Sequence, residues 1–255
     1  DFQLIEIGGT IGDIESLPFI EAIRQFKTEI GIGNAISIHT TLLPYLPTSG
    51  ELKTKPSQHS VQVLRSYGIQ PEILVCRTTK PIPKTEKEKL ALFCSVPKEA
   101  VIECRDMKSI YEVPLALEDQ NMAHVVLDML RVEDRPADLT NWKKLVENIK
   151  NPKGTVKVGI AGKYTKLSDA YISVVESLKH AGYADDVKVE IKWINSEECI
   201  DMKKCKELLS DVQAVVVPGG FGVRGIEGKL NVIRYARENN LPFLGLCLGM
   251  QCAVI

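Results

Sequence analysis

The chain has 255 residues, with 44% hydrophobic residues, 25% charged residues and a formal net charge of −1. This balance excludes a disordered chain and a strongly basic surface, so we expect no nucleic-acid partner. The apolar runs, such as residues 214–217, are far shorter than the about 20 residues of a membrane-spanning helix, so we expect no membrane partner either.

The cysteines indicate the compartment. There are seven of them, an odd number, and no two form a C-x-x-C pair. We therefore expect a reducing cytoplasm and no zinc site. The sequence starts at Asp1 and stops within the apolar stretch 248–255 without a helix-ending signal, so we interpret it as an internal part of a longer protein.

Short β-rich runs alternate with helix-period segments through the first half of the chain. This alternation predicts βαβ units around a parallel sheet. The expected strands are residues 2–7, 35–39, 72–76 and 100–103, and the expected helices lie near 17–29, 57–67, 85–94 and 114–130.

The character changes at residues 131–154, which are polar, contain Pro136 and Pro152 and hold one amphipathic helix over 138–150. We interpret this stretch as an interdomain linker, between a first domain over 1–130 and a second over 155–255. In the second domain the expected strands are 155–161, 187–194, 213–218 and 242–246, and the expected helices are 169–182, 200–209 and 227–239. Both domains are therefore predicted to be α/β.

The segment FLGLCLGMQC (residues 243–252) predicts a strand that enters a tight turn with Cys247 at its apex, followed by a helix. Gly245 and Gly249 give the turn backbone room. The amino end of the helix favours thiolate over thiol, and the N–H of Leu248 can face a developing oxyanion. The glycine-rich loop PGGFGVRG (residues 218–225) offers a second donor.

Two interpretations of Cys247 remain open from these residues. The cysteine is either a nucleophile or one of the packed thiols, with glycines that only make a turn, because short motifs also occur by chance. The glycine-rich loop one βα unit earlier favours the nucleophile. Cys252, inside the expected helix, is interpreted as an ordinary core residue.

The two segments resemble the class I glutamine amidotransferases. The resemblance implies that Cys247 attacks the amide carbon of glutamine, that Gly220 and Leu248 donate to the oxyanion, and that Gly249, Met250 and Gln251 form part of the glutamine pocket. In that family a histidine base and a glutamate follow well downstream, so the 255-residue segment alone is expected to be inactive. His180 is expected on the polar face of a helix.

The first domain has its own group of polar residues. Glu6 lies near the end of an expected strand, and Asp13 and Glu15 precede a helix. Carboxylates at the carboxyl edge of a parallel sheet are suited to Mg²⁺ and nucleotide phosphates, although Asp13 and Glu15 could also complement a helix dipole. The loop KTKPSQHS (residues 53–60) suits a triphosphate; alternatively, its lysines are solvated surface charges.

The segments EIGGTIGDIES (6–16) and ELKTKPSQHSV (51–61), followed in order by 84–94 and 105–115, resemble the amidoligase domain of the CTP synthase family. The resemblance implies a partial P-loop-type amidoligase α/β domain followed by a partial class I glutamine amidotransferase α/β domain. No G-x-x-x-x-G-K-[ST] motif occurs in the sequence; the family's phosphate loop lies upstream of the matching segments.

The resemblance also implies roles for individual residues. Glu6 would bind Mg²⁺, and three residues, Arg105, Asp106 and Met107, would border the ATP adenine. The residues expected to contact UTP or CTP are Asp13, Ile14, Glu15, Lys53, Thr54, Lys55, Pro56, Ser57, Gln58 and Lys89.

The activity implied is the ATP-dependent amination of UTP to CTP with ammonia released from glutamine, a ligase reaction that forms a C–N bond. The family further implies Mg²⁺, stimulation by GTP, feedback binding of CTP, and homotetramers with filaments as a further assembly. Two alternatives stay open: another class I glutamine amidotransferase, or a degenerate paralogue that acts as a regulatory or assembly subunit.

Overall fold

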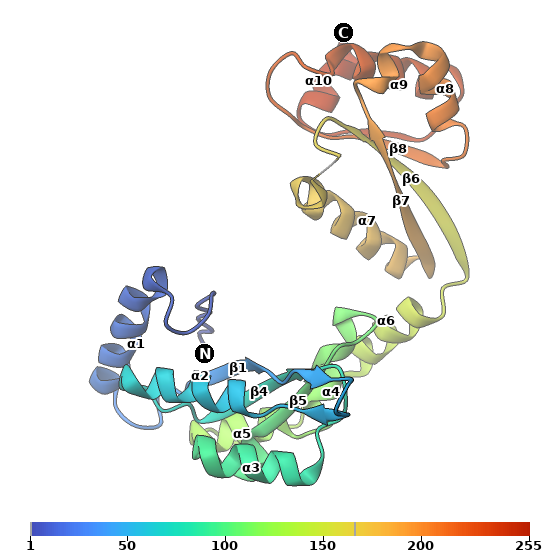
Figure 1. Cartoon of the computed structure of the whole chain (residues 1–255). Coiled ribbons are helices and arrows are strands. Elements are labelled where there is room, and N and C mark those ends of the chain that lie inside the picture. The colour runs from blue at the N-terminus through green and yellow to red at the C-terminus, as the bar shows by residue number, and fades with distance from the viewer. Residues whose placement is uncertain (1, 166) are drawn as a thin grey trace. The chain divides into compact units, whose positions relative to one another are not determined.

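The computed structural model describes residues 2–165 and 167–255. Its contacts divide the chain into two compact units, Asp1–Leu139 and Thr140–Ile255, each of which combines helices with parallel strands (Figure 1). In the part of the chain that the structure describes, no helix has the length and apolar character needed to cross a membrane.

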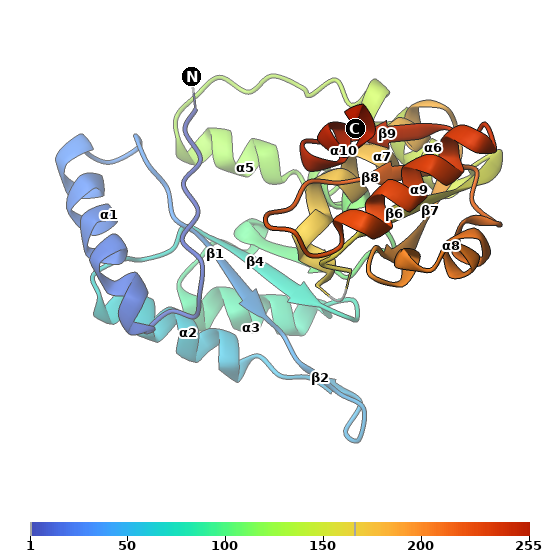
Figure 2. The same cartoon turned by 90° about the horizontal axis from the view of Figure 1, so that it is seen from above.

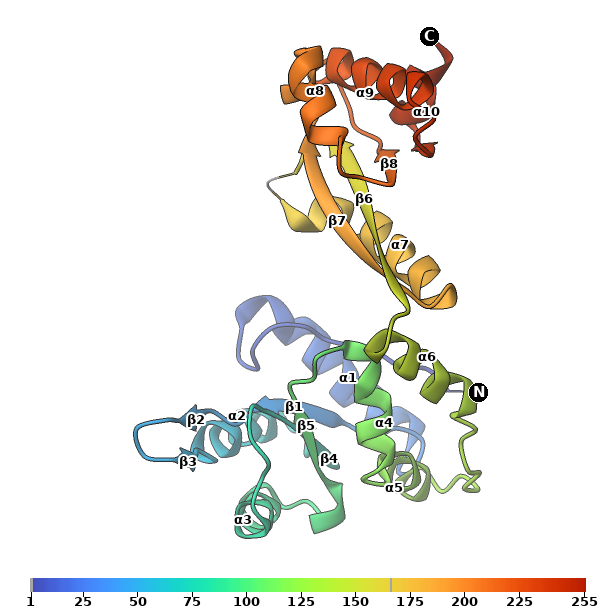
Figure 3. The ribbon, with the colours of Figure 1, turned by 90° about the vertical axis from the view of Figure 1, so that its right-hand side faces the viewer.

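The first unit contains the sheet β1-β4-β5, in which neighbouring strands are parallel. Figure 2 shows β1 and β4 side by side. Leu42 pairs with Arg77, and Thr78 pairs with Arg105, so the carboxyl ends of the strands meet at one edge. A short hairpin, which the sequence did not predict, projects between β1 and α2 (Figure 3). The strands are β1 (Ile38–Leu42), β2 (Tyr45–Leu46), β3 (Glu51–Leu52), β4 (Ile73–Thr78) and β5 (Val101–Arg105).

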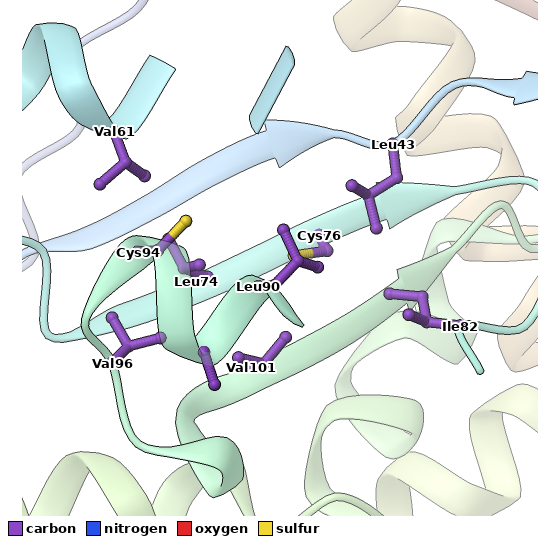
Figure 4. Packing of buried hydrophobic residues seen from close by; sticks show 10 residues of the cluster. Leu43, Val61, Leu74, Cys76, Ile82, Leu90, Cys94, Val96 and Val101 are labelled. Carbon is purple, nitrogen blue, oxygen red and sulfur yellow. The ribbon is translucent and has the colours of Figure 1, made fainter. Parts of the chain in front are cut away.

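Helices cover both faces of this sheet. Successive side chains of a strand point to opposite faces, so the residues of β4 alternate between two hydrophobic cores. Leu74 and Cys76 join the core with Val61 of α2 and Leu90 of α3 (Figure 4), whereas Ile73 packs with the α5 side. The helical segments are η1 (Ile14–Ser16), α1 (Leu17–Ile30), α2 (Lys55–Ser66), α3 (Lys84–Cys94), η2 (Lys98–Ala100), η3 (Ile110–Glu112), α4 (Val113–Glu118) and α5 (Met122–Met129).

Three predictions for the first unit were wrong in detail. Residues 2–7 are not a strand, and Leu4 is 94% exposed; β-rich residues form a strand only beside a partner, and in the described sheets none pairs with this segment. The strand expected at 35–39 lies at Ile38–Leu42. The helix expected over 114–130 is split into α4 and α5 by Asn121, whose φ is 57°.

The second unit is built on the parallel sheet β7-β6-β8-β9, so the predicted parallel sheets are confirmed in both units. Helix α7 lies along β7 (Figure 3), and α8 and α9 pack together beside the sheet. The strands are β6 (Gly154–Gly162), β7 (Val187–Asn195), β8 (Ala214–Val217) and β9 (Phe243–Gly245). The helical segments are α6 (Thr140–Lys150), η4 (Ser168–Tyr171), α7 (Ile172–Ala184), η5 (Glu198–Ile200), α8 (Met202–Leu209), α9 (Ile226–Glu238) and α10 (Leu248–Val254).

The core of the first unit can be tested on α3, where Leu90 is 0% exposed and Leu92 is 75% exposed. We expect Leu90→Ala to lower the free energy of unfolding of this unit by about 2–5 kcal/mol, because it removes buried methyl groups and leaves a cavity. The matched control Leu92→Ala should change it by less than about 0.5 kcal/mol. Urea unfolding followed by circular dichroism measures both, and equal losses in the two variants would contradict the packing described.

Candidate active site

Cys247 lies between β9 and α10, beside the loop that follows β8. The two strands pair with Val217 opposite Gly245, so the residues two positions further along, Gly219 and Cys247, come to lie next to each other. A Cβ added to Gly219 would be 3.4 Å from the Cβ of Cys247 and 3.7 Å from its Sγ. The structure therefore brings the glycine-rich loop and the cysteine together.

The backbone of Cys247 is strained. Its φ is 52° and its ψ is −112°, a combination that costs a residue with a side chain on the order of 1–3 kcal/mol. The flanking glycines allow it: a Cβ on Gly245 would lie 2.7 Å from the Met250 nitrogen, and one on Gly249 would lie 1.9 Å from the Val217 oxygen. The pattern G-x-C-x-G thus reflects the close approach of α10 to β8 and β9.

Helix α10 begins directly after the cysteine, with Gln251 N–H donating to the Cys247 carbonyl at 3.0 Å. The N–H of Leu248 belongs to the first turn, where N–H groups have no acceptor within the helix. Met250 and Gln251 are exposed, and Leu248 is half-buried. Cys247 is exposed and Cys252 is buried, so only the first of these two thiols is open to a substrate.

Two lysines that the sequence reasoning did not select hold the glycine-rich loop. The ammonium of Lys229 donates to the Pro218 carbonyl at 2.7 Å, and that of Lys163 donates to the Phe221 carbonyl. Burial lowers the pKa of Lys229. The burial of Lys229 could have been predicted from the sequence, because Lys229, Val232 and Ala236 follow the helical spacing of one buried face.

His180 lies exposed on α7, with its ring centroid 6.2 Å from that of Tyr183. This location agrees with its expected place on the polar face of a helix. The residues that surround Cys247 within the described contacts are instead the loop glycines and the start of α10.

In the first unit, the start of α2 is fastened to the end of β1. The Ser57 hydroxyl donates to the Leu42 carbonyl at 3.1 Å and lies 2.8 Å from the Thr41 hydroxyl, while the Gln58 amide donates to the Thr54 hydroxyl at 3.1 Å. Thr54 and Ser57 are buried. Lys55 and Pro56 are exposed, so this turn presents a cation at the amino end of a helix.

Lys53 and Lys89 act on the same carboxylate, Glu51 of the hairpin. Lys53 Nζ is 2.6 Å from Glu51 Oε2. The pKa of Glu51 is lowered first by the hydrogen bond and charge of Lys53 and then by the charge of Lys89. Lys89 of α3 itself lies 3.8 Å from Glu86. Sequence reasoning missed Glu51, which is the ion-pair partner of Lys53.

Arg105 is the last residue of β5, and Asp106 and Met107 follow it at the same sheet edge. Arg105 pairs with Glu103 at 2.8 Å, and Asp106 pairs with Arg77 at 3.0 Å. The Asp106 N–H donates to the Thr78 carbonyl at 3.0 Å. Met107 is half-buried. The two contacts of Asp106 hold the turn against the end of β4.

The predicted acidic residues near the start of the chain lie before α1. Asp13 Oδ2 accepts from the Thr10 N–H at 2.9 Å, which closes a turn rather than capping the helix. Glu6, Ile14 and Glu15 are exposed. Within residues 2–165 and 167–255, no group of three or more His, Cys, Asp or Glu side chains could hold a metal ion.

A hollow of about 560 Å³ lies elsewhere in this unit, against α1 and the end of α2. It contains none of the predicted site residues, so it does not bear on them. Its lining residues are Leu17, Ile20, Glu21, Arg24, Ser66, Tyr67 and Gly68.

Comparison with known proteins identifies the family of both units. A family model described as "CTP synthase N-terminus" matches residues 1–132, and one described as "Glutamine amidotransferase class-I" matches residues 166–255. The chain belongs to the CTP synthase family. The fold of this family, an amidoligase domain followed by a class I glutamine amidotransferase domain, is therefore the predicted one.

Similarity to CTP synthases extends over the whole chain. The CTP synthase of Synechocystis sp. is 57% identical over 255 residues, which cover 100% of this chain and 46% of the relative. That of Methanocaldococcus jannaschii is 56% identical over 261 residues, covering 100% of this chain and 48% of the relative. The chain thus spans about half the length of the curated relatives it matches.

Among solved structures, the glutaminase domain of Trypanosoma brucei CTPS with bound acivicin is 38% identical and has a TM-score of 0.37. The match covers 39% of this chain and 39% of the other.

The exposure of the cysteines leads to a prediction for thiol labelling. We expect iodoacetamide at pH 8 to modify Cys247 before the other cysteines, because it is exposed while Cys76, Cys199 and Cys205 are buried. Burial also raises the pKa of Cys76 to about 11, and only the thiolate reacts. Peptide mass spectrometry over time measures the order. The fast modification should disappear in Cys247→Ala, and equally fast labelling of Cys76 would contradict the site.

Proposed function

We propose that this chain is part of a CTP synthase that aminates UTP with ammonia released from glutamine at Cys247. The main support is the identity of 55–57% to curated CTP synthases over the whole chain. It is reinforced by a strained, exposed Cys247 beside the glycine-rich loop. We assign residues 1–130 to the synthetase domain, 131–154 to the linker and 155–255 to the glutaminase domain.

The glutaminase step is covalent catalysis. The Cys247 sulfur attacks the amide carbon of glutamine, a C–S bond forms, and the carbonyl electrons move to the oxygen. The N–H groups of Gly220 and Leu248 stabilise this oxyanion. Its collapse breaks the C–N bond and releases ammonia, for which the family's histidine moves the proton. Water then hydrolyses the thioester, while Gly249, Met250 and Gln251 contribute to the glutamine pocket.

The synthetase step consists mainly of positioning and charge neutralisation. ATP phosphorylates the uracil 4-oxygen, and ammonia then displaces the phosphate. The cations Lys53, Lys55 and Lys89 suit the UTP phosphates, and Lys53 already pairs with the carboxylate of Glu51. The remaining nucleotide contacts are assigned to Asp13, Ile14, Glu15, Thr54, Pro56, Ser57 and Gln58 for UTP or CTP, and to Arg105, Asp106 and Met107 for ATP.

Glu6 is the residue of this chain proposed to hold Mg²⁺. Mg²⁺ keeps several waters and commonly takes one or two carboxylates together with substrate phosphates, so a single exposed carboxylate fits a shared ligand set. When bound, the ion neutralises phosphate charge. We further propose, by family membership, stimulation by GTP, feedback binding of CTP, homotetramers that extend to filaments, and a cytoplasmic location.

The proposed function can be tested in the full-length protein that contains this chain. We expect Cys247→Ala to lower glutamine-dependent CTP formation by about a thousandfold or more, because the covalent step is lost. Ammonia-dependent CTP formation from UTP and ATP should remain. A nucleotide absorbance assay with each nitrogen source measures both activities. Loss of both in a folded variant would contradict a separate ammonia-releasing site, and absence of both in the wild type would favour a non-catalytic paralogue.

Lys53 provides a test of UTP recognition. We expect Lys53→Gln to raise the KM for UTP about tenfold, because a charged hydrogen bond to phosphate contributes roughly 1.5–3 kcal/mol. The matched control is Lys98→Gln, since Lys98 is also exposed and ion-paired, to Glu88 at 3.0 Å. Steady-state kinetics with ammonia as nitrogen source measures the KM. An equal KM in both variants would remove Lys53 from the UTP site.

A further inference from the structure

A buried lysine lies beneath the loop that approaches Cys247. Among the described residues, Lys229 of α9 is the largest of the fully buried side chains, with 0% exposure. Lysine is almost never fully buried unless it is paired. In residues 2–165 and 167–255 no carboxylate forms an ion pair with its ammonium, which instead donates to the Pro218 carbonyl at 2.7 Å. The buried ammonium of Lys229 is thus hydrogen-bonded to one backbone group, the Pro218 carbonyl.

That backbone group directly precedes the glycines beside the nucleophile. A trans peptide is planar, so fixing the Pro218 carbonyl also fixes the direction of the Gly219 N–H. On the other side of Gly220, the Lys163 ammonium holds the Phe221 carbonyl. A Cβ placed on Gly220 would be 3.1 Å from Lys163 Cε and 3.7 Å from Lys229 Nζ. The two ammonium groups therefore bracket the glycine pair from both ends.

The two glycines of this loop, Gly219 and Gly220, need side chains of other residues to hold their backbone in place. Glycine loses more conformational freedom on ordering than other residues and has no side chain to pack. The loop's opposite side already faces Cys247, whose Cβ lies 3.4 Å from a Cβ placed on Gly219. The charged groups around Lys229 come from several elements. Burial and the charge of Lys163 lower its pKa, and the thiols of Cys252 and Cys247 on the α10 side act in the opposite direction.

We propose that Lys229 is a positioning residue for glutamine hydrolysis. Its ammonium holds the Pro218 carbonyl and so fixes the Pro218–Gly219 peptide plane, from which the next residue, Gly220, directs its N–H toward the oxyanion formed after attack by Cys247. The inference rests on the proposed glutaminase function and adds a residue that does not touch the reacting atoms. Lys163 supports the loop from its other end.

The test uses the full-length protein with Lys229→Met, which keeps an unbranched side chain but removes the charge and the donor. Because misplacement of a catalytic group by about 1 Å can cost on the order of a hundredfold, we expect kcat for glutamine hydrolysis to fall about 10- to 100-fold. The KM for glutamine should change less than about threefold, since an interaction made only in the transition state affects kcat. Ammonia-dependent CTP formation should be unchanged.

The rate of Cys247 alkylation distinguishes a misplaced loop from a less reactive thiol. Iodoacetamide alkylates Cys247 by displacement at a tetrahedral carbon and forms no oxyanion, so its rate should stay within about twofold of the wild type. Lys229→Gln retains an N–H donor and should recover part of the lost kcat. A parallel fall in alkylation and hydrolysis would overturn the proposal, because the defect would then lie in the thiol itself.

Two controls address stability and charge on the same helix. Val232→Ala removes buried volume from α9 without touching the loop, and Arg234→Met removes an exposed cation. Both should keep kcat at a temperature where they are folded by thermal melting. The proposal is overturned if folded Lys229→Met has wild-type kcat, if Lys229→Gln is no better than Lys229→Met, or if Val232→Ala loses as much. If instead wild-type hydrolysis survives Cys247→Ala, the proposed function fails first.

Discussion

The parallel pairing of β8 with β9 fixes the geometry around Cys247. Because Val217 is opposite Gly245, both strands end at the same level, and the residues after them must turn away side by side. One turn becomes the glycine-rich loop, and the other becomes the strained cysteine at the start of α10. The strain is maintained because α10 lies against β8, where the Val217 carbonyl leaves no space for a side chain at Gly249. A shift of either strand by one residue would separate the loop from the thiol.

In the first unit, too, parallel strands that end at one edge of the sheet bring functional residues together, but these residues are hydroxyls and cations instead of a thiol. The parallel strands β1, β4 and β5 bring the start of α2 and the turn after β5 to one side of the sheet. Buried hydroxyls, such as those of Thr41 and Ser57, fasten the backbone there, while cations remain near the surface. The exposed carboxylate of Glu51 pairs with Lys53 at 2.6 Å, so this cation is held beside an anion of the same chain.

The comparison between sequence and structure shows what local patterns can specify. Alternating β-rich and helix-period segments predicted parallel sheets, because that alternation reflects burial on both faces. The turn at Cys247 was predictable, since glycines two residues on either side have a steric meaning. Residues 2–7 failed as a strand because pairing depends on a neighbour that local residues do not encode. The strands of the β2–β3 hairpin are too short to show a strand-like alternation of residues. The left-handed backbone of Asn121 was not predicted from the sequence. Lys229 was overlooked because lysine is normally assigned to the surface, although its spacing matched the buried face of α9.

The elements that create the strained cysteine all belong to one compact unit: β8, β9, α9 and α10 lie within Thr140–Ile255. The strands and helices that set the backbone geometry of the thiol are therefore those of the second unit. A nucleophile assembled in this self-contained way can be inherited as a module. Evolution can join such a module to different acceptor domains without rebuilding the turn, so selection on the acceptor and selection on the nucleophile can act separately.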